Sequence, residues 1–282
     1  MTARRATERR RIFAMGGGGF GSPPGDPALD EFVLEIADAA RPRICLLPTA
    51  SGDPEEQIRR FYSAYRDLPC EPTHLSLFRL GTQPVDLRDH VLGQDIVYVG
   101  GGSLLNLLAV WRAHGLDVVL REAWLRGVVL CGISAGAMCW FEAGVTKSFG
   151  APRAVPALGF LRGSSSVHHG AEHDRGRCYA AAVAAGSVPP GLAVDDGAGV
   201  LFEGMELSSA VTARPGAAAY WVGRLDGTVV QRPLAMSLLR SERESERDPN
   251  TPLSIAEFRE LRRARGRPNR LGSYSAESEA PW

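Results

Sequence analysis

Residues 128–140 decide the fold, and they read VVLCGISAGAMCW. An apolar run of strand character leads straight into Gly-x-Ser-x-Gly, and small residues with a helical pattern follow. A strand that turns at once into a helix presents its central serine, here Ser134, in a strained and exposed position, and small flanking residues let the backbone turn without clashes. The next amide, that of Ala135, then points to where an oxyanion would form. Ser134 is therefore a candidate nucleophile, and a helix N-cap is the alternative interpretation.

Length and composition indicate one large domain with a substantial core. The chain has 282 residues, 44% of them hydrophobic, and it carries 32 basic and 32 acidic residues. This balance leaves no global field to recruit nucleic acid or an anionic membrane, so neither is an expected partner. The five cysteines are odd in number and form no CxxC pair, which indicates reduced thiols and a cytoplasmic protein. No apolar run reaches the roughly 18 residues of a membrane span.

Strands and helices alternate through the first half of the chain. Apolar runs predict the strands, and apolar residues at helical spacing predict the helices. The expected strands are 11–15, 43–49, 73–78 and 95–99, and the expected helices are one that begins at Pro27 and those at 51–65, 104–114 and about 116–125. Such alternation predicts an α/β fold, with a mostly parallel, doubly wound sheet and helices on both faces.

A run of glycines follows the first strand, at 16–19. It is similar to a dinucleotide fingerprint, but that fingerprint requires immediate entry into a helix. Residues 22–27 read SPPGDP and block such an entry. The run therefore predicts a loop beside an active-site cleft, and no cofactor is expected.

Beyond Gly144 the pattern becomes less regular. Residues 164–175 read SSSVHHGAEHDR and predict a polar loop, and an alanine-rich helix is expected at about 177–185. Short strands are expected to finish the same domain, partly antiparallel, at 192–194, 200–202, 208–212, 219–222 and 228–231. The predicted organisation is a solvated basic arm (1–10), one α/β catalytic domain (11–236) and a charged, partly disordered extension (237–282) with a helix at about 253–263.

A nucleophilic serine needs a base to take its proton and an acid to orient that base. His168, His169 and His173 cluster in the polar loop after the elbow, where catalytic groups tend to collect. A metal site is the alternative for such a cluster, but its spacing lacks the HExxH pattern, so no metal is expected. Asp195 and Asp196 end an apolar strand before a glycine turn and are the best candidates for the acid.

Donors for an oxyanion are expected at two places. One is the amide of Ala135, and the other is the glycine run that ends the strand at 95–99. The amide of Gly101 or Gly102 would pair with that of Ala135. The alternative interpretation of the glycine run is a tight turn from strand to helix.

The order of these motifs separates two classes of hydrolase. The α/β-hydrolases place the nucleophile first, then the acid, then the histidine, whereas here the histidines precede the acid. The motifs instead resemble the peptidase E family of serine dipeptidases, which is related to cyanophycinases; they are YVGGGSLLNLL (98–108), GISAGA (132–137), VHH (167–169) and DDGA (195–198). The resemblance runs from residue 11 to about 234 and implies a fold like that of class I glutamine amidotransferases.

Carried over by position, the resemblance implies roles for individual residues. Ser134 is the nucleophile, Asp196 the acid and His168 the base, with His169 as the fallback. The implied reaction is hydrolysis of dipeptides that begin with aspartate. Arg175 would hold the substrate carboxylate, because a guanidinium fork suits that group.

The expected pocket departs from the family pattern in three places. Ser103 stands where Asn is usual, a change that the oxyanion backbone tolerates. Residues 146–150 read TKSFG where members commonly have TDSFG, and His169-Gly170 replaces the usual Tyr-Asp. If that aspartate contacts the substrate's α-amino group, Lys147 reverses the charge there. We therefore expect a changed substrate preference, set around Lys147, His169 and Arg175.

The sequence thus predicts a serine peptidase that removes residues from the N-terminus of dipeptides or short peptides through an acyl-enzyme. Two alternatives stay open. One is a cyanophycinase-like hydrolase of β-linked aspartyl-arginine, and the other is a pseudoenzyme that binds a small peptide without cleaving it. A small peptide is the expected partner, and a homodimer stays open as the assembly.

Overall fold

The structure is a computed structural model that describes residues 10–21 and 27–241. These residues belong to one compact unit, Met1–Glu242. Most of the predicted basic arm, the helix at 253–263 and the tail beyond it lie outside the described residues. The proposed division of the chain at 10 and 237 stays a prediction.

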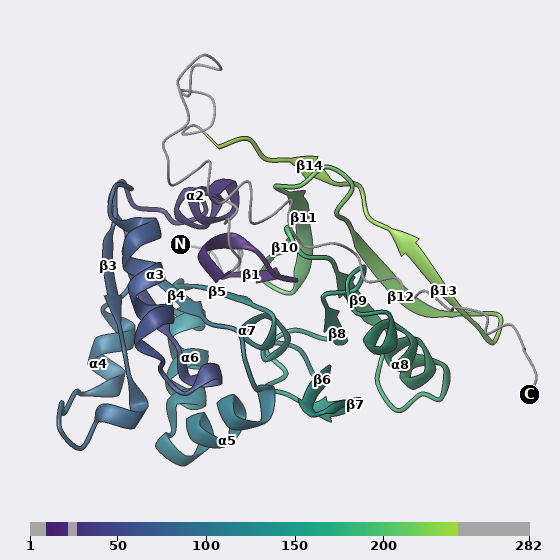
Figure 1. Cartoon of the computed structure of the whole chain (residues 1–282), viewed down its shortest axis with the longest axis horizontal. Coiled ribbons are helices and arrows are strands. Elements are labelled where there is room, and N and C mark those ends of the chain that lie inside the picture. The colour runs from purple at the N-terminus through teal and green to yellow at the C-terminus, as the bar shows by residue number, and fades with distance from the viewer. Residues whose placement is uncertain (1–9, 22–26, 242–282) are drawn as a thin grey trace, which may run out of the picture. The chain divides into compact units, whose positions relative to one another are not determined.

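The first sheet of the described part has eight strands in the order β14-β11-β10-β1-β5-β4-β2-β3 (Figure 1). They are β1 (Arg11–Met15), β2 (Arg43–Leu47), β3 (Glu71–His74), β4 (Ile96–Val99), β5 (Val129–Ile133), β10 (Ala198–Glu203), β11 (Glu206–Thr212) and β14 (Ser237–Leu238). The five strands from β1 to β3 are parallel, whereas β10 pairs antiparallel with β1 and β11. Because β4 and β5 are parallel neighbours, the segments that follow them meet at one edge of the sheet.

Helices cover both faces of this sheet. Strand residues alternate between two cores: in β4, Val97 and Val99 pack with one set of helices, and Ile96 and Tyr98 pack with the other. The first set is α4 (Leu87–Leu92), α5 (Leu104–His114) and α6 (Leu116–Leu125), and the second is α2 (Pro27–Glu35) and α3 (Glu55–Tyr65). This arrangement confirms the predicted α/β fold with helices on both faces.

The rest of the described part forms a second sheet that the sequence does not predict. Its six strands lie in the order β13-β12-β9-β8-β6-β7. They are β6 (Ala143–Phe149), β7 (Ala151–Pro156), β8 (Ser164–Val167), β9 (Gly191–Val194), β12 (Ala219–Leu225) and β13 (Thr228–Pro233), and α8 (His173–Ala184) packs on them. The predicted finishing strands are therefore split, because β10 and β11 extend the first sheet while β9, β12 and β13 join the second.

Some of the predicted elements and boundaries are wrong. The polar run at 164–166 is a buried strand rather than a loop, and α8 begins at His173 rather than at 177. The helix at 51–65 begins only at Glu55, because Pro54 occupies its N-cap after a 3-10 turn, η2 (Thr49–Ser51). The strand at 73–78 ends at His74, and another 3-10 turn, η3 (Leu77–Arg79), follows it.

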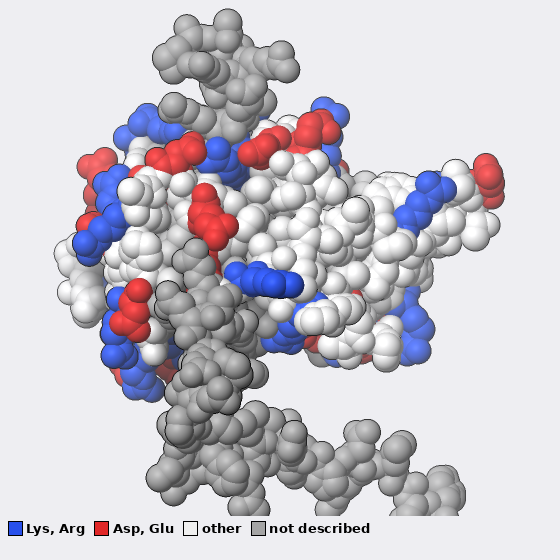
Figure 2. All heavy atoms as spheres, turned by 90° about the horizontal axis from the view of Figure 1, so that it is seen from above, with Lys and Arg blue, Asp and Glu red and all other residues white. Residues whose placement is uncertain are grey.

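Charges are mixed over the surface. Figure 2 shows basic and acidic side chains interspersed on the visible part of one face, without a patch of a single sign. Among the described residues, no helix combines the length and apolar character that crossing a membrane requires.

Candidate active site

The elbow holds Ser134 between β5 and α7 (Ala135–Met138). Its φ is +53°, in the left-handed region that residues with a side chain rarely adopt. Both flanking glycines are required by close backbone contacts. A Cβ on Gly132 would lie 2.4 Å from the carbonyl oxygen of Gly136, and one on Gly136 would lie 2.3 Å from that of Val99. The Gly-x-Ser-x-Gly pattern is thus a packing requirement of this turn.

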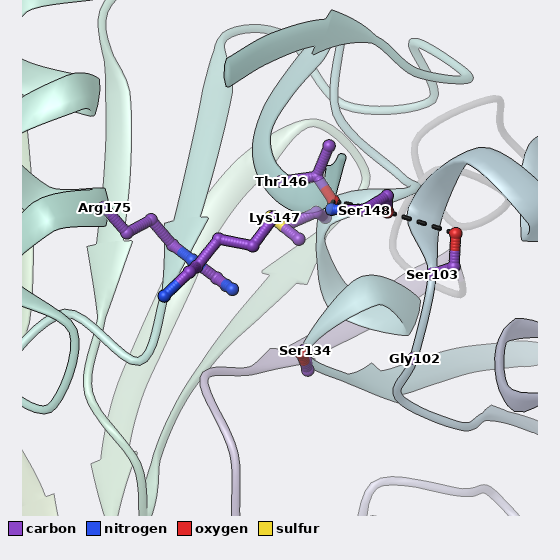
Figure 3. Close-up of a pocket in the computed structure, with 8 residues that line it drawn as sticks. Gly102, Ser103, Ser134, Thr146, Lys147, Ser148 and Arg175 are labelled. Atoms are coloured by element: carbon purple, nitrogen blue, oxygen red, sulfur yellow. Dashed lines mark hydrogen bonds between the residues drawn. The ribbon is translucent and has the colours of Figure 1, made fainter. Parts of the chain in front are cut away.

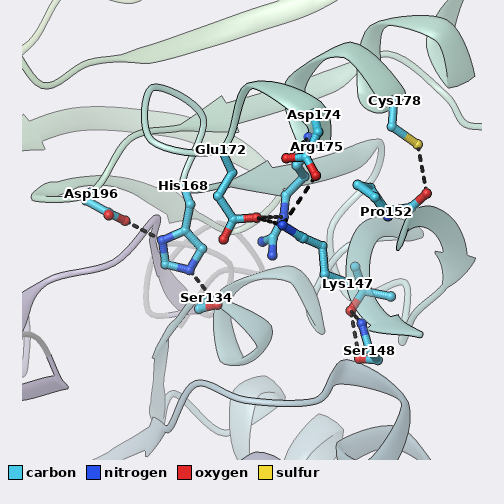
Figure 4. Close-up of polar contacts among 11 residues, drawn as sticks. Ser134, Lys147, Ser148, Pro152, His168, Glu172, Asp174, Arg175, Cys178 and Asp196 are labelled. Carbon is cyan, nitrogen blue, oxygen red and sulfur yellow. Dashed lines mark hydrogen bonds and ion pairs between the residues drawn. The ribbon is translucent and has the colours of Figure 1, made fainter. Parts of the chain in front are cut away.

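Three side chains form a hydrogen-bonded chain at the elbow (Figure 4). His168 Nε2 lies 2.9 Å from Ser134 Oγ, and His168 Nδ1 contacts Asp196 Oδ1. Ser134 follows β5 of the first sheet, while His168 and Asp196 follow the neighbouring strands β8 and β9 of the second sheet. The structure therefore brings together the three residues that the sequence predicts for the triad.

The histidine sits in a tight turn. His168 has φ +54°, and its carbonyl accepts hydrogen bonds from the amides of Ala171 (3.1 Å) and Glu172 (2.8 Å). Asp195 holds this turn from the other side. Its Oδ1 accepts from Gly170 N (2.7 Å), and its Oδ2 accepts from Ala218 N (3.0 Å). Of the two adjacent aspartates, Asp196 thus contacts the imidazole ring and Asp195 contacts the backbone of the turn.

The glycine run after β1 lies against the same residues. Gly17 forms a bridge to Asp196, and the amide of Gly197 donates to the carbonyl of Gly17 (2.9 Å). A Cβ on Gly17 would lie 2.2 Å from Asp196 Oδ1 and 3.0 Å from His168 Cε1. The glycine loop thus lies against the His168–Asp196 pair, and Gly17 leaves the room that their contact needs.

The environment of Asp196 favours its ionised form. The hydrogen bond from His168 holds the pKa of this carboxyl below its usual range, with help from the charges of Arg214 and Arg175 and against the effect of partial burial. An ionised Asp196 accepts the Nδ1 proton of His168, which leaves Nε2 free to accept a proton from Ser134.

The predicted oxyanion donors lie close to Ser134, since Ala135 follows it in the chain and Gly102 lines the same pocket. Gly101 lies beside the serine, since a Cβ there would be 3.3 Å from the Cβ of Ser134. Within the described part of the chain, the amides of Gly101, Gly102 and Ala135 donate to no protein acceptor. Ala135 also begins α7, although a helix this short adds little dipole of its own. These amides are free to donate to an oxyanion.

A pocket of about 270 Å³ opens beside Ser134 (Figure 3). Its lining residues are Gly102, Ser103, Ser134, Met138, Thr146, Lys147, Ser148 and Arg175. This lining contains two cations and no carboxylate. Three of its hydroxyl residues, Ser103, Thr146 and Ser148, were not singled out from the sequence as site residues.

The two cations share acidic partners at the start of α8 (Figure 4). Lys147 Nζ lies 3.2 Å from Glu172 Oε2 and 3.3 Å from Asp174 Oδ2, and these two carboxylates raise the pKa of the lysine. Arg175 Nε lies 3.2 Å from the same Glu172 oxygen. Arg175 is only 6% exposed, and burial lowers its pKa. Within the described residues, neither its Nε nor its Nη1 has a hydrogen-bond partner, and Nη1 has no ion-pair contact either.

His169 is placed differently from the prediction. Its Nε2 lies 3.2 Å from Gln231 Oε1 of β13, its ring packs on Tyr220 of β12, and it is not among the pocket residues. The backbone explains this, because the turn at His168 sends the next side chain toward the second sheet. His168, not His169, therefore faces Ser134. In residues 10–21 and 27–241, no group of three or more His, Cys, Asp or Glu side chains is arranged to hold a metal ion.

The cysteines beside the elbow are not candidate nucleophiles. Cys131 and Cys139 flank the elbow but are fully buried, and burial raises their pKa well above the usual value for a thiol. Buried thiols of this kind are poor nucleophiles at neutral pH.

Comparison with known proteins places this site in a family. The sequence model described as peptidase family S51 matches residues 12–210, which include the elbow, the histidine turn and both aspartates. The chain belongs to peptidase family S51. The resemblance to the peptidase E family is thereby confirmed, and the protein is a peptidase, a class of hydrolase.

Relatives of this S51 peptidase agree with the assignment. It is 45% identical over 230 residues to the uncharacterized peptidase YgaJ of Bacillus subtilis (strain 168), which is 82% of this chain and 99% of YgaJ. A crystal structure of a peptidase from an acI-B1 actinobacterium matches with a TM-score of 0.61 at 16% identity, over 82% of this chain and 96% of that one. A putative peptidase E protein from Listeria monocytogenes EGD-e matches with a TM-score of 0.51 at 15% identity, over 71% and 96%. At these identities the two structures show a shared fold.

Proposed function

We propose that this S51 peptidase is a serine dipeptidase that uses Ser134, His168 and Asp196 as its catalytic triad. The observation that carries the proposal is the 2.9 Å contact between Ser134 Oγ and His168 Nε2, with Asp196 on the far side of the ring. A base within hydrogen-bond reach of the hydroxyl, itself oriented by an acid, is the arrangement that activates a serine.

In the proposed reaction His168 acts first as a base and then as an acid. Its Nε2 takes the proton of Ser134 Oγ as that oxygen attacks the scissile carbonyl carbon. The amides of Ala135 and of Gly101 or Gly102 donate to the resulting oxyanion. As the C–N bond breaks, His168 gives the proton to the leaving amine, and an acyl-enzyme remains. Water then attacks the ester carbonyl while His168 takes its proton, and His168 gives that proton to Ser134 Oγ as the ester C–O bond breaks, which releases the acid and the free serine.

The pocket supports a short substrate that carries a carboxylate. A volume of about 270 Å³ lies just below the roughly 300–1,000 Å³ of sites for drug-sized ligands. Its lining has positive charges from Arg175 and Lys147 and no acidic residue. Arg175, with its unused buried Nη1, is proposed to bind the side-chain carboxylate of a substrate such as Asp-Leu.

A lysine at position 147 is unsuited to direct contact with the α-ammonium group of a substrate. Its own charge opposes an ammonium, but Glu172 and Asp174 lie beside it and offset that charge. A preference for β-linked aspartyl-arginine remains the enzymatic alternative, since it too presents an acidic group and a cation.

The proposal predicts that wild-type protein cleaves dipeptides and that Ser134→Ala does not. A dipeptide library, read by liberation of free amino acids, should show turnover for wild type, with acidic first residues preferred. Turnover should fall to background for the variant, because the hydroxyl that contacts His168 is gone. Equal turnover by both proteins would exclude Ser134 as the nucleophile. Saturable binding by wild type without any turnover would indicate the non-catalytic alternative.

A further inference from the structure

The pocket beside Ser134 has two walls of different chemistry (Figure 3). Arg175 and Lys147 supply the cationic wall, while three hydroxyl side chains supply the other. We call the three hydroxyls of Ser103, Ser148 and Thr146 the hydroxyl row. The proposed mechanism gives the row no role.

Hydrogen bonds hold the hydroxyl row together. Ser103 Oγ donates to Ser148 Oγ over 3.1 Å, and Ser148 Oγ lies 2.8 Å from Thr146 Oγ1. Backbone amides anchor both ends, since Asn106 N donates to Ser103 Oγ (3.2 Å) and Ser148 N donates to Thr146 Oγ1 (3.2 Å). The row thus connects the N-terminus of α5 to β6, and two elements fix its position.

The protons of the row can be counted. Each hydroxyl carries one proton, and the two contacts between hydroxyls use two of the three. Because Ser103 donates to Ser148, the remaining O–H belongs to Ser148 or Thr146. Within the described part of the chain, neither hydroxyl bonds to a further acceptor. Thr146 is only 2% exposed, so bulk water has little access to this end of the row.

A donor without an acceptor is costly at a buried position and informative when it lines a pocket. We propose that the hydroxyl row is a substrate subsite that donates one hydrogen bond to a side-chain oxygen of the residue bound in the pocket. An O–H carries no net charge, so it serves a carboxylate or a carboxamide, whereas the cationic wall favours the carboxylate. The inference rests on the proposed function and adds a determinant of specificity to it. A side chain of similar shape without an oxygen would leave the donor unpaired.

The test removes the donor from β6. In Thr146→Val/Ser148→Ala the valine keeps the shape of the threonine, while Thr146→Ser is the control that keeps the hydroxyl and loses only a methyl group. Three dipeptides are compared, Asp-Leu, Asn-Leu and Leu-Leu, of which the last two differ mainly in the side-chain amide. Thermal melts establish that each variant is folded, and Thr146→Ala/Ser148→Ala, which also removes both hydroxyls, replaces the double variant if that one is not.

The double variant should lower kcat/KM for Asp-Leu and Asn-Leu by about tenfold relative to Leu-Leu, as the loss of one hydrogen bond implies. The Thr146→Ser control should keep the wild-type ratio. A fall of the same size for all three dipeptides, or no fall, would overturn the subsite. A fall for Asp-Leu alone would assign the effect to charge and would also overturn it.

Binding measurements separate this inference from the catalytic proposal. On a Ser134→Ala background, titration calorimetry with Asp-Leu measures affinity without turnover. Adding the double substitution should weaken the Kd by about tenfold. An unchanged Kd would exclude the hydroxyl row as a subsite even if Ser134 is the nucleophile. A weakened Kd would support it even if wild type cleaves none of the three dipeptides.

Discussion

Two adjacent aspartates fix His168 through different contacts. Asp196 binds the ring nitrogen of His168, and Asp195 binds the backbone of the turn that carries it. Neighbouring residues can do so because successive side chains at a strand end point in opposite directions. The residues alone leave both carboxylates before the glycine open as the acid, and the family resemblance predicts Asp196. Only the structure assigns them different contacts.

Asp196→Asn should abolish most activity and change how stability depends on pH. The amide keeps the shape but does not hold the proton on Nδ1, and kcat should fall by on the order of 10⁴, as in other serine triads. The pKa of Asp196 is lower in the folded protein than in the unfolded chain. The ionised carboxylate therefore contributes fully to the free energy of unfolding above the ordinary carboxyl pKa of about 4. This contribution is lost as the pH falls through the lower pKa of the folded protein. Urea unfolding from about pH 7 to about pH 2 measures this contribution.

The two proteins should converge in stability at the acidic end of that range, because the wild type alone loses the ionised Asp196 there. An identical pH profile for wild type and Asp196→Asn would show that the carboxylate is not stabilised by His168. Activity near wild type in the variant would exclude Asp196 as the acid.

At the scale of elements, the turn between β8 and α8 is the part that the site depends on most. It places His168 at φ +54°, and it is tied at one end by the amides of Ala171 and Glu172 and at the other by Asp195. Glu172, at the end of the turn, also pairs with Lys147 of β6. The position of the base is therefore coupled to the charged wall of the pocket.

Asp195→Ala should loosen this turn without touching the ring of His168. Two amides, of Gly170 and Ala218, would lose a charged acceptor, which should lower the free energy of unfolding by about 1–3 kcal/mol. We expect kcat to fall about tenfold or more and KM to change less, because the base is displaced while the pocket lining stays intact. Steady-state kinetics and denaturant unfolding measure both effects. Asp67→Ala, at an exposed site, is the matched control; a wild-type kcat for Asp195→Ala would contradict the positioning role.

Some of the elements that form the site could be predicted from the sequence, and others could not. Strands β1, β2, β4 and β5 of the first sheet are almost wholly apolar and the elbow has its own pattern, so these parts could be predicted. Strand β8 could not, because Ser164–Ser166 read as polar although all three are buried between β6 and β9. The contact of Lys147 with Glu172 joins positions far apart in the chain, and no periodicity encodes such a pair. The hydroxyl row is also assembled from two elements, which explains why only part of the pocket was predicted.

At the scale of the whole molecule, the candidate site lies where two sheets meet. Ser134 and the glycines that flank its oxyanion region come from the first sheet, and His168 and Asp196 come from the second. The bridge between Gly17 and Asp196 joins the two at the triad itself. The family match to residues 12–210 includes all of these site residues. A chain that folds only one of the sheets would therefore lack a complete site.

The central claim is that this arrangement activates Ser134, and covalent labelling tests it most directly. A fluorophosphonate probe reacts with a serine whose hydroxyl is activated by a neighbouring base. Intact-mass analysis of the treated wild type should show one adduct, and peptide mapping should locate it on Ser134. The Ser134→Ala variant should remain unmodified under the same conditions. A wild-type protein that cleaves dipeptides yet takes up no label at Ser134, or a variant that is labelled equally well, would contradict the account.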